Sequence, residues 1–418
     1  MYGLWLVIFG SLLAFCLLYL TFVTESASLP SRPPCIVIGV THSQTCMVLR
    51  GRLQALRLAG FRVVLVCSPG ALAEQLAGEE GAEFRPLSIC RSIAPLRDLL
   101  AFLRLYFLLL RLRPDLCEFS TPKAGLLGTM AACIAGVPSR VYMLRGLRLE
   151  AARGLQRRIL LQCERLAARC AHTVLCNSES LRRQAIELQL APEGKLQLLG
   201  RGSSNGVNVA HYAPGSDTLR ASLKIPSDAP VVGFVGRFTY AKGMPDLLES
   251  FDLLLQSQPR AHLLLVGWFD AAEDALSESW QSRILNHPRI HVTGMVSDCA
   301  PCYRAMDLLV LPSWREGFPN AVLEAAASGL PVVTTQATGA CDSVVHGETG
   351  LLIPPGYPTA LCRAVLSLLE HPERRRQMGM AARARAIAQF STDTVLNRTV
   401  EFYLQLSSTR AHRLVTTG

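Results

Sequence analysis

Two acidic residues, eight positions apart, carry the clearest chemistry in this sequence. The segment 315–331 reads REGFPNAVLEAAASGLP and follows an apolar run, 308–311, that is typical of a buried strand. Pro319 suits the first turn of a helix, and the closing Gly-Leu-Pro marks its end. Glu324 therefore falls inside a short helix of small apolar residues, where its charge needs a partner. Because a nucleotide ribose offers two hydroxyl donors, we predict that Glu324 binds a nucleotide.

Glu316 precedes the same helix and lies near the free amides at its start, where a negatively charged diphosphate is also favoured. The alternative is that Glu316 and Glu324 are both ordinary surface carboxylates. The spacing of the pair and its place directly after a strand favour a ligand site over that alternative.

A cationic turn, GRFTYAKG at 236–243, follows another predicted strand, 231–235. Arg237 can bind two phosphate oxygens at once, and Lys242 can add a point charge. The chain has only four lysines among its 42 basic residues, so the presence of a lysine here is informative. Taken alone, the turn is equally compatible with a solvated loop; together with the acidic pair it predicts a diphosphate site.

Strands and helices alternate in two separate series. Apolar runs at 35–40 and 61–67 flank a helical pattern that extends to Gly60, and predicted helices at 96–112 and 124–135 continue the series with strands near 115–119 and 140–144. A second series starts at Pro230, with a helix predicted over 244–257. Each series is typical of a parallel sheet covered by helices, so we predict an α/β protein with two Rossmann-like domains that face a cleft.

The length supports the same division, because 418 residues exceed one ordinary core. We place a first domain at 34–205 and a second at 206–390, followed by a C-terminal helix at 391–418 that either stays with the second domain or crosses back to the first. Residues 1–210 carry 24 basic and 13 acidic side chains, whereas residues 211–418 carry 18 and 19. The first domain therefore holds the basic surface.

Several functional classes lose support from composition. The sequence has no zinc-finger spacing or nucleic-acid motif, so we predict no nucleic-acid partner. It also has no Asp-x-Asp motif, whose carboxylates commonly bind the metal ion of a metal-bound nucleotide. We therefore predict neither a metal nor another cofactor. The fourteen cysteines lie in apolar stretches and are typical of a reducing compartment.

An uncharged apolar run of twenty residues extends from Leu4 to Val23. Its length matches a hydrocarbon core of about 30 Å, so we predict a single transmembrane anchor at 1–24. A cleaved signal peptide is the alternative, but no basic residue precedes the run. Arg32 and the arginines after it predict a catalytic body on the cytoplasmic side of the inner membrane.

The sequence resembles the family-4 retaining glycosyltransferases of the GT-B fold. The resemblance lies in the spacing of Glu316 and Glu324, in the turn with Arg237 and Lys242, and in the run GMVSDCAPCYRAMDLLVLPS that starts at Gly294. It implies that Glu324 holds the ribose, that Glu316 contacts donor-sugar hydroxyls and that the two cations bind the diphosphate. By the same resemblance, the donor site also includes Gly236 and the amides of Phe318, Asn320 and Ala321.

Three further strings are similar to capsule, exopolysaccharide and O-antigen transferases: STPKAG from Ser120, LRGLR from Leu144 and GRGSSNGV from Gly200. Many relatives carry a histidine on the first-domain side of the cleft, which this chain lacks, and retaining enzymes of this fold are thought to use the leaving phosphate as base. The resemblance implies roles on the acceptor side or at the hinge for Lys123, Arg145, Ser203, Asn205 and Gly206. A purely structural hinge is the alternative for the last three.

The expected reaction transfers a hexose or N-acetylhexosamine, with retention, from a nucleotide diphosphate sugar to a polyprenyl-diphosphate-linked saccharide in surface polysaccharide synthesis. A uridine diphosphate donor is expected from the resemblance alone. Two alternatives remain: a sugar-nucleotide epimerase of the same fold, and a non-catalytic membrane scaffold.

The helical segment 96–114 is almost wholly apolar, with arginines recurring every seven residues, and residues 145–169 hold seven more. This composition suits either an interfacial helix on anionic lipid or a core helix whose arginines reach past the sheet to solvent. We therefore include membrane lipid among the predicted partners.

Overall fold

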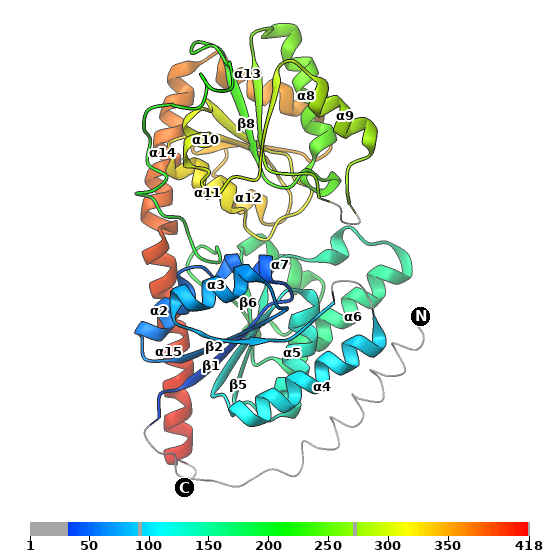
Figure 1. Cartoon of the computed structure of the whole chain (residues 1–418), viewed down its shortest axis with the longest axis vertical. Coiled ribbons are helices and arrows are strands. Elements are labelled where there is room, and N and C mark those ends of the chain that lie inside the picture. The colour runs from blue at the N-terminus through cyan, green and yellow to red at the C-terminus, as the bar shows by residue number, and fades with distance from the viewer. Residues whose placement is uncertain (1–31, 91–93, 271–273, 417–418) are drawn as a thin grey trace. The chain divides into compact units, whose positions relative to one another are not determined.

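The computed structural model describes residues 32–90, 94–270 and 274–416, with side chains as far as residue 408 (Figure 1). The chain forms two compact units. Unit 1 contains the chain up to Cys176, residues 182–199 and the segment from Leu396 onward, and unit 2 contains residues 177–181 and 200–395. The predicted anchor at 1–24 lies outside the described residues. No helix among the described residues is both long and apolar enough to cross a bilayer.

Unit 1 is built on a seven-stranded sheet in the order β3-β2-β1-β4-β5-β6-β7, in which all neighbours are parallel. The buried positions of the central strands β1, β2 and β4 are apolar except for Glu118 and Ser120, because helices cover both faces of a parallel sheet. The strands are β1 Cys35–Gly39, β2 Arg62–Cys67, β3 Glu83–Pro86, β4 Leu116–Ser120, β5 Ser139–Leu144, β6 Thr173–Cys176 and β7 Leu196–Leu198.

The helices of unit 1 cover both faces of this sheet (Figure 1). On one face, residues of α2 and α3 share a buried core with Phe402 and Tyr403 of α15, and on the other α4 and α6 both pack against α5. The helices are η1 Ser43–Leu49, α2 Arg52–Leu58, α3 Ala71–Glu80, α4 Pro95–Leu112, α5 Pro122–Ile134, η2 Arg148–Glu150, α6 Gly154–Cys170, α7 Glu179–Glu187, which begins in unit 2, and η3 Glu193–Lys195.

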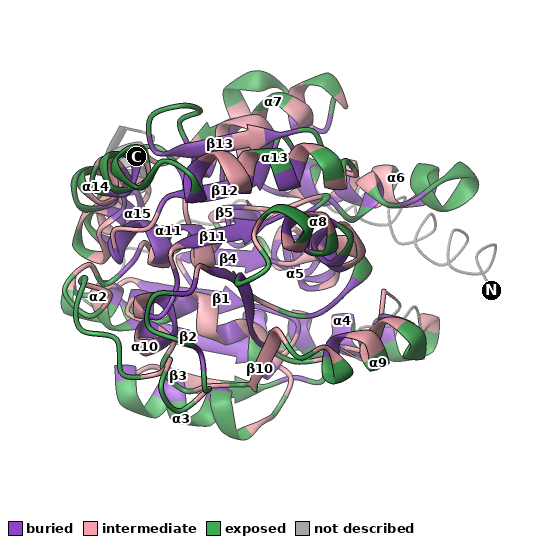
Figure 2. Cartoon of the chain, turned by 90° about the horizontal axis from the view of Figure 1, so that it is seen from above, coloured by how far each residue is buried: buried purple, intermediate pink, exposed green. Residues whose placement is uncertain are grey.

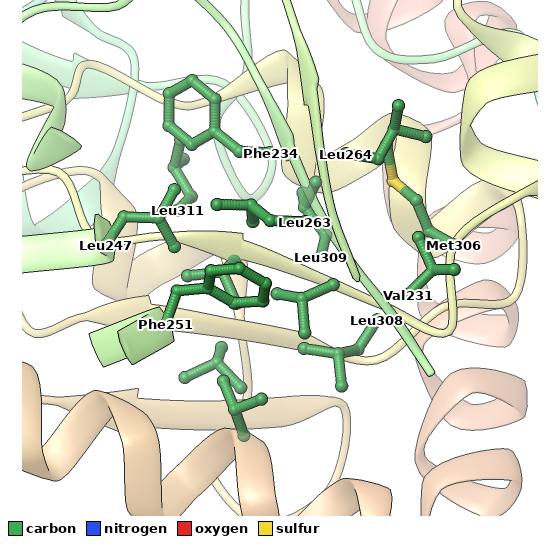
Figure 3. Close-up of a cluster of buried hydrophobic side chains, with 14 of the residues drawn as sticks. Val231, Phe234, Leu247, Phe251, Leu263, Leu264, Met306, Leu308, Leu309 and Leu311 are labelled. Carbon is green, nitrogen blue, oxygen red and sulfur yellow. The ribbon is translucent and has the colours of Figure 1, made fainter. Parts of the chain in front are cut away.

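Unit 2 repeats the design with a six-stranded parallel sheet in the order β10-β9-β8-β11-β12-β13. Leucine, valine and phenylalanine side chains from β8, β9 and β11 interlock with Leu247 and Phe251 of α8 (Figure 3). The strands are β8 Val231–Val235, β9 His262–Val266, β10 Ile290–Gly294, β11 Leu308–Leu311, β12 Val332–Thr335 and β13 Gly350–Ile353.

The helices of unit 2 also form two layers. Helix α13 packs against α8, and α11 packs against both α10 and α14. Coloured by burial, the central strands of both units are enclosed, whereas the edge strands β3 and β10 are only partly buried and many helices expose their outer faces (Figure 2). The helices are η4 Tyr240–Lys242, α8 Met244–Ser257, α9 Glu278–Asn286, α10 Ala300–Arg304, α11 Asn320–Ala327, α12 Ala340–Ser343, α13 Pro358–Leu369 and α14 Pro372–Phe390, followed by α15 Thr392–Thr416, which begins in unit 2 and belongs to unit 1 from Leu396 onward.

The predicted pair of Rossmann-like domains is confirmed, and one segment differs in detail from the predicted helix. The helical pattern that leads to Gly60 is split into η1 and α2, because Gly51 adopts a left-handed φ of 80° between them. The carboxylate of Glu80 accepts hydrogen bonds from the amides of Gly51 and Gln54, at 2.5 and 3.1 Å. A side chain from α3 thus caps α2, which periodicity along the chain does not reveal.

Candidate functional site

The strand order of unit 2 places the predicted site at a topological switch point. Strands β8 and β11 are neighbours, and the chain leaving β8 goes to one side of the sheet while the chain leaving β11 goes to the other. In open parallel sheets, the crevice beyond the carboxyl ends of two such strands is where ligands bind. The loop after β8 contains Arg237 and Lys242, and the loop after β11 contains Glu316.

Lys242 and Glu316 form an ion pair across this switch point. The Nζ of Lys242 donates to Oε1 of Glu316 at 2.5 Å, and the two side chains are 21% and 11% exposed. Such partial burial strengthens the attraction relative to a pair in open solvent. The structure therefore brings together two of the three residues predicted as catalytic.

Glycines hold these loops in place through close contacts of backbone with backbone. Gly243, directly after Lys242, has a φ of 70°, and a Cβ at this position would lie 2.1 Å from the carbonyl oxygen of Pro312. Gly339 has a φ of 74°, and a Cβ there would lie 2.3 Å from the carbonyl oxygen of Gly317. Only glycine fits at either position, so the backbones on both sides of the Lys242–Glu316 pair are fixed by the sequence.

Arg237, the third predicted catalytic residue, lies on the same loop as Lys242 but has a different acidic partner. Its guanidinium is half-exposed and bonded to the carboxylate of Asp270, which follows β9. Gly236 leaves β8 with a φ of 151°, and its carbonyl oxygen would be 1.9 Å from a Cβ on Gly267. The turns after β8 and β9 are therefore also packed backbone to backbone.

Helix α11 begins one residue later than the prediction, because Pro319 takes the N-cap position instead of the first turn. Within the described chain, the amides of Phe318, Asn320 and Ala321 have no hydrogen-bond acceptor. Free amides at a helix start attract anions. The side chain of Phe318 turns away into a buried cluster, where its ring lies 5.1 Å from the ring of Phe390.

Glu324 lies on α11 as predicted, and two tyrosines already hold its carboxylate. The Tyr303 hydroxyl donates to Oε2 of Glu324 at 2.8 Å, and Tyr212 donates a further hydrogen bond. Burial raises the pKa of the Glu324 carboxyl, while the two phenols act in the opposite direction because they stabilise the charged form. Burial is the larger effect, so the net pKa lies above its ordinary value, and the two phenols hold the carboxyl group in a fixed orientation.

Tyr212 and Tyr303 both contact Glu324 in the candidate site, and the sequence did not identify them. Their rings pack edge to face, with centroids 5.8 Å apart. Tyr303 lies within the family-like run that starts at Gly294, which was an available signal. Tyr212 lies more than a hundred residues before Glu324, and nothing in its surroundings in the sequence marks it.

The predicted hinge residues Ser203, Asn205 and Gly206 form a tight turn within unit 2. The Ser203 hydroxyl accepts the amide of Gly206 at 3.2 Å, and the buried Oδ1 of Asn205 has no partner among the described residues. A Cβ on Gly206 would lie 2.6 Å from the carbonyl oxygen of Phe390. The adjoining Val207 exchanges backbone hydrogen bonds with Phe390 and Thr392.

Lys123 and Arg145 lie in unit 1, each at the carboxyl end of a strand of its sheet. Lys123, in the first turn of α5, donates to the buried carboxylate of Asp98 at 2.8 Å. Arg145 follows β5 and lies 3.9 Å from Glu118, in a buried cluster that also contains Arg52. Burial lowers the pKa of Arg145 to about 10. In this conformation both cations are engaged with protein carboxylates.

No group of three or more potential metal-ligating side chains gathers among the residues that the structure describes. Two histidines of unit 2, His262 and His291, are in contact, with their ring nitrogens 2.8 Å apart. Burial lowers the pKa of His262 to about 4, so this ring is neutral at physiological pH.

Comparisons with known proteins agree with this geometry. Residues 229–371 match the family model described as "Glycosyl transferases group 1", and residues 48–202 match the "Glycosyl transferase 4-like domain". The chain is 34% identical to the Staphylococcus aureus capsular polysaccharide biosynthesis glycosyltransferase CapM, over 87% of this chain and 95% of that one.

Two further proteins extend the comparison. An Escherichia coli UDP-Gal:alpha-D-GlcNAc-diphosphoundecaprenol alpha-1,3-galactosyltransferase is 27% identical over 76% of this chain and 84% of its own. The crystal structure of Anabaena HepE in complex with UDP-glucose superposes with a TM-score of 0.74 at 23% identity, covering 89% of this chain and 99% of that one. This last likeness concerns the fold.

Proposed function

We propose, from the premise that this chain belongs to the family-4 glycosyltransferases of the GT-B fold, that it moves a hexose or N-acetylhexosamine from a uridine diphosphate sugar to a polyprenyl-diphosphate-linked saccharide. The single observation that carries the proposal is the 2.5 Å pair of Lys242 and Glu316 at the switch point of unit 2. The start of α11 and Glu324 follow Glu316 along the same segment of the chain.

The charges of the site fit a diphosphate that becomes more negative as the bond to the sugar breaks. Lys242, Arg237 and the amides at the start of α11 are the positive groups available to the departing diphosphate. In the structure, Glu316 and Asp270 neutralise the two cations. A bound diphosphate neutralises Lys242 and Arg237 instead. Glu316 is then able to accept hydrogen bonds from sugar hydroxyls. Such preorganised charges stabilise the transition state more than the ground state.

We assign the nucleoside of the donor to the part of the site around Glu324. The Glu324 carboxylate, held by Tyr303, accepts hydrogen bonds from the two ribose hydroxyls. A uracil base and a lipid-linked acceptor are supported by the substrates in the name of the galactosyltransferase relative, and a role in capsule or exopolysaccharide synthesis by the name of the CapM relative. Retention of configuration and independence of metal ions complete the proposal.

Attachment to the membrane by residues 4–23, with the catalytic body on the cytoplasmic side, is part of the same proposal. It is supported by the uncharged length of that segment and by the arginines that follow it. A lipid-linked acceptor would then be presented at the surface to which the enzyme is anchored.

The test measures melting temperature against a panel of nucleotide sugars and then measures turnover. A donor that binds only the folded protein raises the melting temperature, and we expect UDP-sugars to do so. Release of UDP should require a polyprenyl-diphosphate N-acetylglucosamine acceptor, should persist in EDTA, and should give a product whose anomeric coupling constant matches that of the donor. Interconversion of donor sugars without acceptor would instead identify an epimerase.

Matched variants separate catalysis from folding. Glu316→Gln and Lys242→Ala should each abolish turnover with little change in melting temperature. Arg260→Ala removes an exposed ion pair with Asp228 in the same unit and should leave turnover unchanged. Normal polysaccharide synthesis in cells that carry only Glu316→Gln would support a scaffold and overturn the proposal.

A further inference from the structure

Helix α4 of unit 1 is apolar on two opposite faces. Its inner face is buried in the unit through Ala101, Phe102, Leu105 and Leu109. Its outer face exposes five large hydrophobic side chains, each between 39% and 71% exposed: Leu96, Leu100, Leu103, Phe107 and Leu110. Helices at the surface of soluble proteins usually bury one stripe and present polar residues on the other side, so this outer face lacks the expected solvent-facing chemistry.

The five side chains form one continuous stripe. They are spaced four, three, four and three residues apart, which keeps them on a single line along the helix. An 18-residue helix is about 27 Å long, and the stripe, from Leu96 to Leu110, follows most of that length. Exposed apolar surfaces of this kind mark contacts with another molecule or with a membrane.

Arginines border the stripe, and no acidic side chain accompanies them on the surface of the helix. Arg97, Arg104 and Arg111 each follow a stripe leucine by one residue, so all three lie along the same flank, and all are exposed. The only acid of α4, Asp98, is buried and bonded to Lys123. The outward charge of α4 is therefore entirely positive.

Helix α6 continues this charge on the same side of the sheet, since α4 and α6 both pack against α5 (Figure 1). Arg153, Arg157 and Arg158 at its start are exposed, as is Leu155 at 64%. Its only acid, Glu164, is buried, and the Tyr142 hydroxyl donates to it at 2.6 Å. Both helices thus bury their acids and expose all of their arginines except Arg165, which is partly buried.

We propose that the outer face of α4, together with the arginines at the start of α6, docks on an anionic lipid bilayer, with the apolar stripe of α4 lying in the interface and the arginines on lipid phosphates. An apolar stripe with cationic borders matches the boundary between acyl chains and anionic headgroups. The surface is separate from the donor site in unit 2, so it is an additional property of the chain and does not depend on the identity of the sugar.

A second copy of the chain is a poorer occupant on grounds of charge. The spacing of the stripe also suits a helix pair, but the arginines then occupy the flanking positions where such pairs place opposite charges. In a parallel pair those arginines would face Leu99 and Tyr106, and in an antiparallel pair they would face one another. Neither arrangement neutralises them, whereas lipid phosphates do.

The test places a fluorescent reporter in the stripe of the full chain. Phe107→Trp keeps an aromatic ring at an exposed position, and Leu285→Trp is the matched control, because Leu285 is 63% exposed on α9 of unit 2. Each variant is reconstituted into vesicles of phosphatidylcholine alone or of an equimolar mixture with phosphatidylglycerol, with and without brominated acyl chains. The reading is the difference in tryptophan emission between variant and parent, so it requires no turnover.

We expect the added emission of the Phe107→Trp variant to shift to shorter wavelength and to be quenched by brominated lipid, more strongly with phosphatidylglycerol. The added emission of the Leu285→Trp variant should not be quenched. Introducing Arg97→Glu, Arg104→Glu and Arg111→Glu into the Phe107→Trp variant should remove the dependence on anionic lipid. Charge reversal at three exposed arginines of unit 2 should leave the dependence on anionic lipid unchanged. These arginines are Arg260, Arg374 and Arg376.

Two outcomes overturn the proposal. The first is quenching in the Phe107→Trp variant that is no greater than in the Leu285→Trp variant, because the stripe would then be as remote from the acyl chains as an exposed site on unit 2. The second is a blue shift in the Phe107→Trp variant without quenching, because protein and not lipid would then cover the stripe.

Discussion

At the scale of single residues, the proposed donor site depends on how Glu324 is held. Its carboxylate is buried within unit 2, yet two phenols stabilise its charged form. The ribose hydroxyls are donors and need a carboxylate acceptor, so nucleotide binding and the protonation of Glu324 must be linked. Tyr303 acts as a positioning residue, because it orients Glu324 and has no assigned contact with the substrate.

Tyr303→Phe removes one of these phenols and leaves the ring in place. We expect UDP affinity to fall by about fivefold, corresponding to roughly 1 kcal/mol for a lost hydrogen bond. Because the phenol lowers the pKa of Glu324, its loss should also raise the pH below which UDP binding weakens. Calorimetric titration with UDP across a pH series measures both effects.

Tyr142→Phe is the control, since Tyr142 is also a buried phenol bonded to a glutamate, but in unit 1. It should leave the pH profile of UDP binding unchanged. A profile that does not move in Tyr303→Phe would contradict the positioning role.

Glu164 in α6 gives a pH-dependent contribution to stability. Burial raises its pKa from 4.5 to about 7, against the opposing effect of the Tyr142 hydrogen bond. The folded protein therefore binds more protons than the unfolded chain between these two values, so stability falls as pH rises through that window and the loss is complete above it. The shift corresponds to roughly 3 kcal/mol.

Glu164→Gln keeps the shape without the charge. It should raise the melting temperature at about pH 8 and have little effect at about pH 5, where the native carboxyl is protonated. Thermal denaturation of both proteins over that range measures the difference. An equal effect at both ends would mean that the carboxyl is not titrating in this window.

At the scale of elements, the Lys242–Glu316 pair depends on loops whose backbone contacts only glycine allows. Gly243→Ala introduces a Cβ 2.1 Å from a backbone oxygen at a left-handed φ, so the loop that carries Lys242 must move. Gly347 also has a left-handed φ, of 82°, but has open space around it. Gly347→Ala should lower stability by about 1 kcal/mol and leave UDP affinity unchanged.

We expect Gly243→Ala to lower UDP affinity more than about tenfold, beyond any change in stability, because it displaces Lys242 from Glu316. Titration with UDP at a temperature where both alanine variants are folded makes the comparison. Equal affinities in the two variants would show that the close approach of Gly243 to Pro312 does not position the pair.

Local sequence patterns predicted most of the elements. The helices expected at 96–112 and 244–257 are found as Pro95–Leu112 and Met244–Ser257, because each is a long stretch with a sustained hydrophobic repeat. The break at Gly51 was not predicted, since it depends on a carboxylate from another helix. Glu324 was found because it is polar within an apolar helix, whereas Tyr212, which supports it, is distant in sequence and lacks such a contrast.

At the scale of the whole molecule, unit 1 is completed by the segment from Leu396 onward, which follows unit 2 in the sequence. Phe402 and Tyr403 of α15 belong to its core, and the Tyr403 hydroxyl bonds to Glu118 while accepting from Arg52 at 3.1 Å. Glu118 and Arg52 are themselves a buried ion pair. The last helix thus covers a charged group inside the first unit.

Tyr403→Ala should destabilise the protein by roughly 4 kcal/mol, since it leaves a cavity and removes a partner of a buried ion pair. Tyr403→Phe should cost about 1 kcal/mol, because only the hydroxyl is lost. Chemical denaturation followed by circular dichroism measures both changes. Similar stabilities for the alanine variant and the parent would mean that α15 does not complete this core.

The position of Tyr403 also sets an order of events during biosynthesis. A ribosome that has released residues 32–199 has made every strand of the first sheet but not the helix that closes its core. Translation of the intervening stretch to Val395, at roughly 10 residues per second, keeps that surface uncovered for about 20 seconds. The nascent first domain therefore waits, with Arg52 and Glu118 still accessible to water, until Tyr403 has left the ribosome.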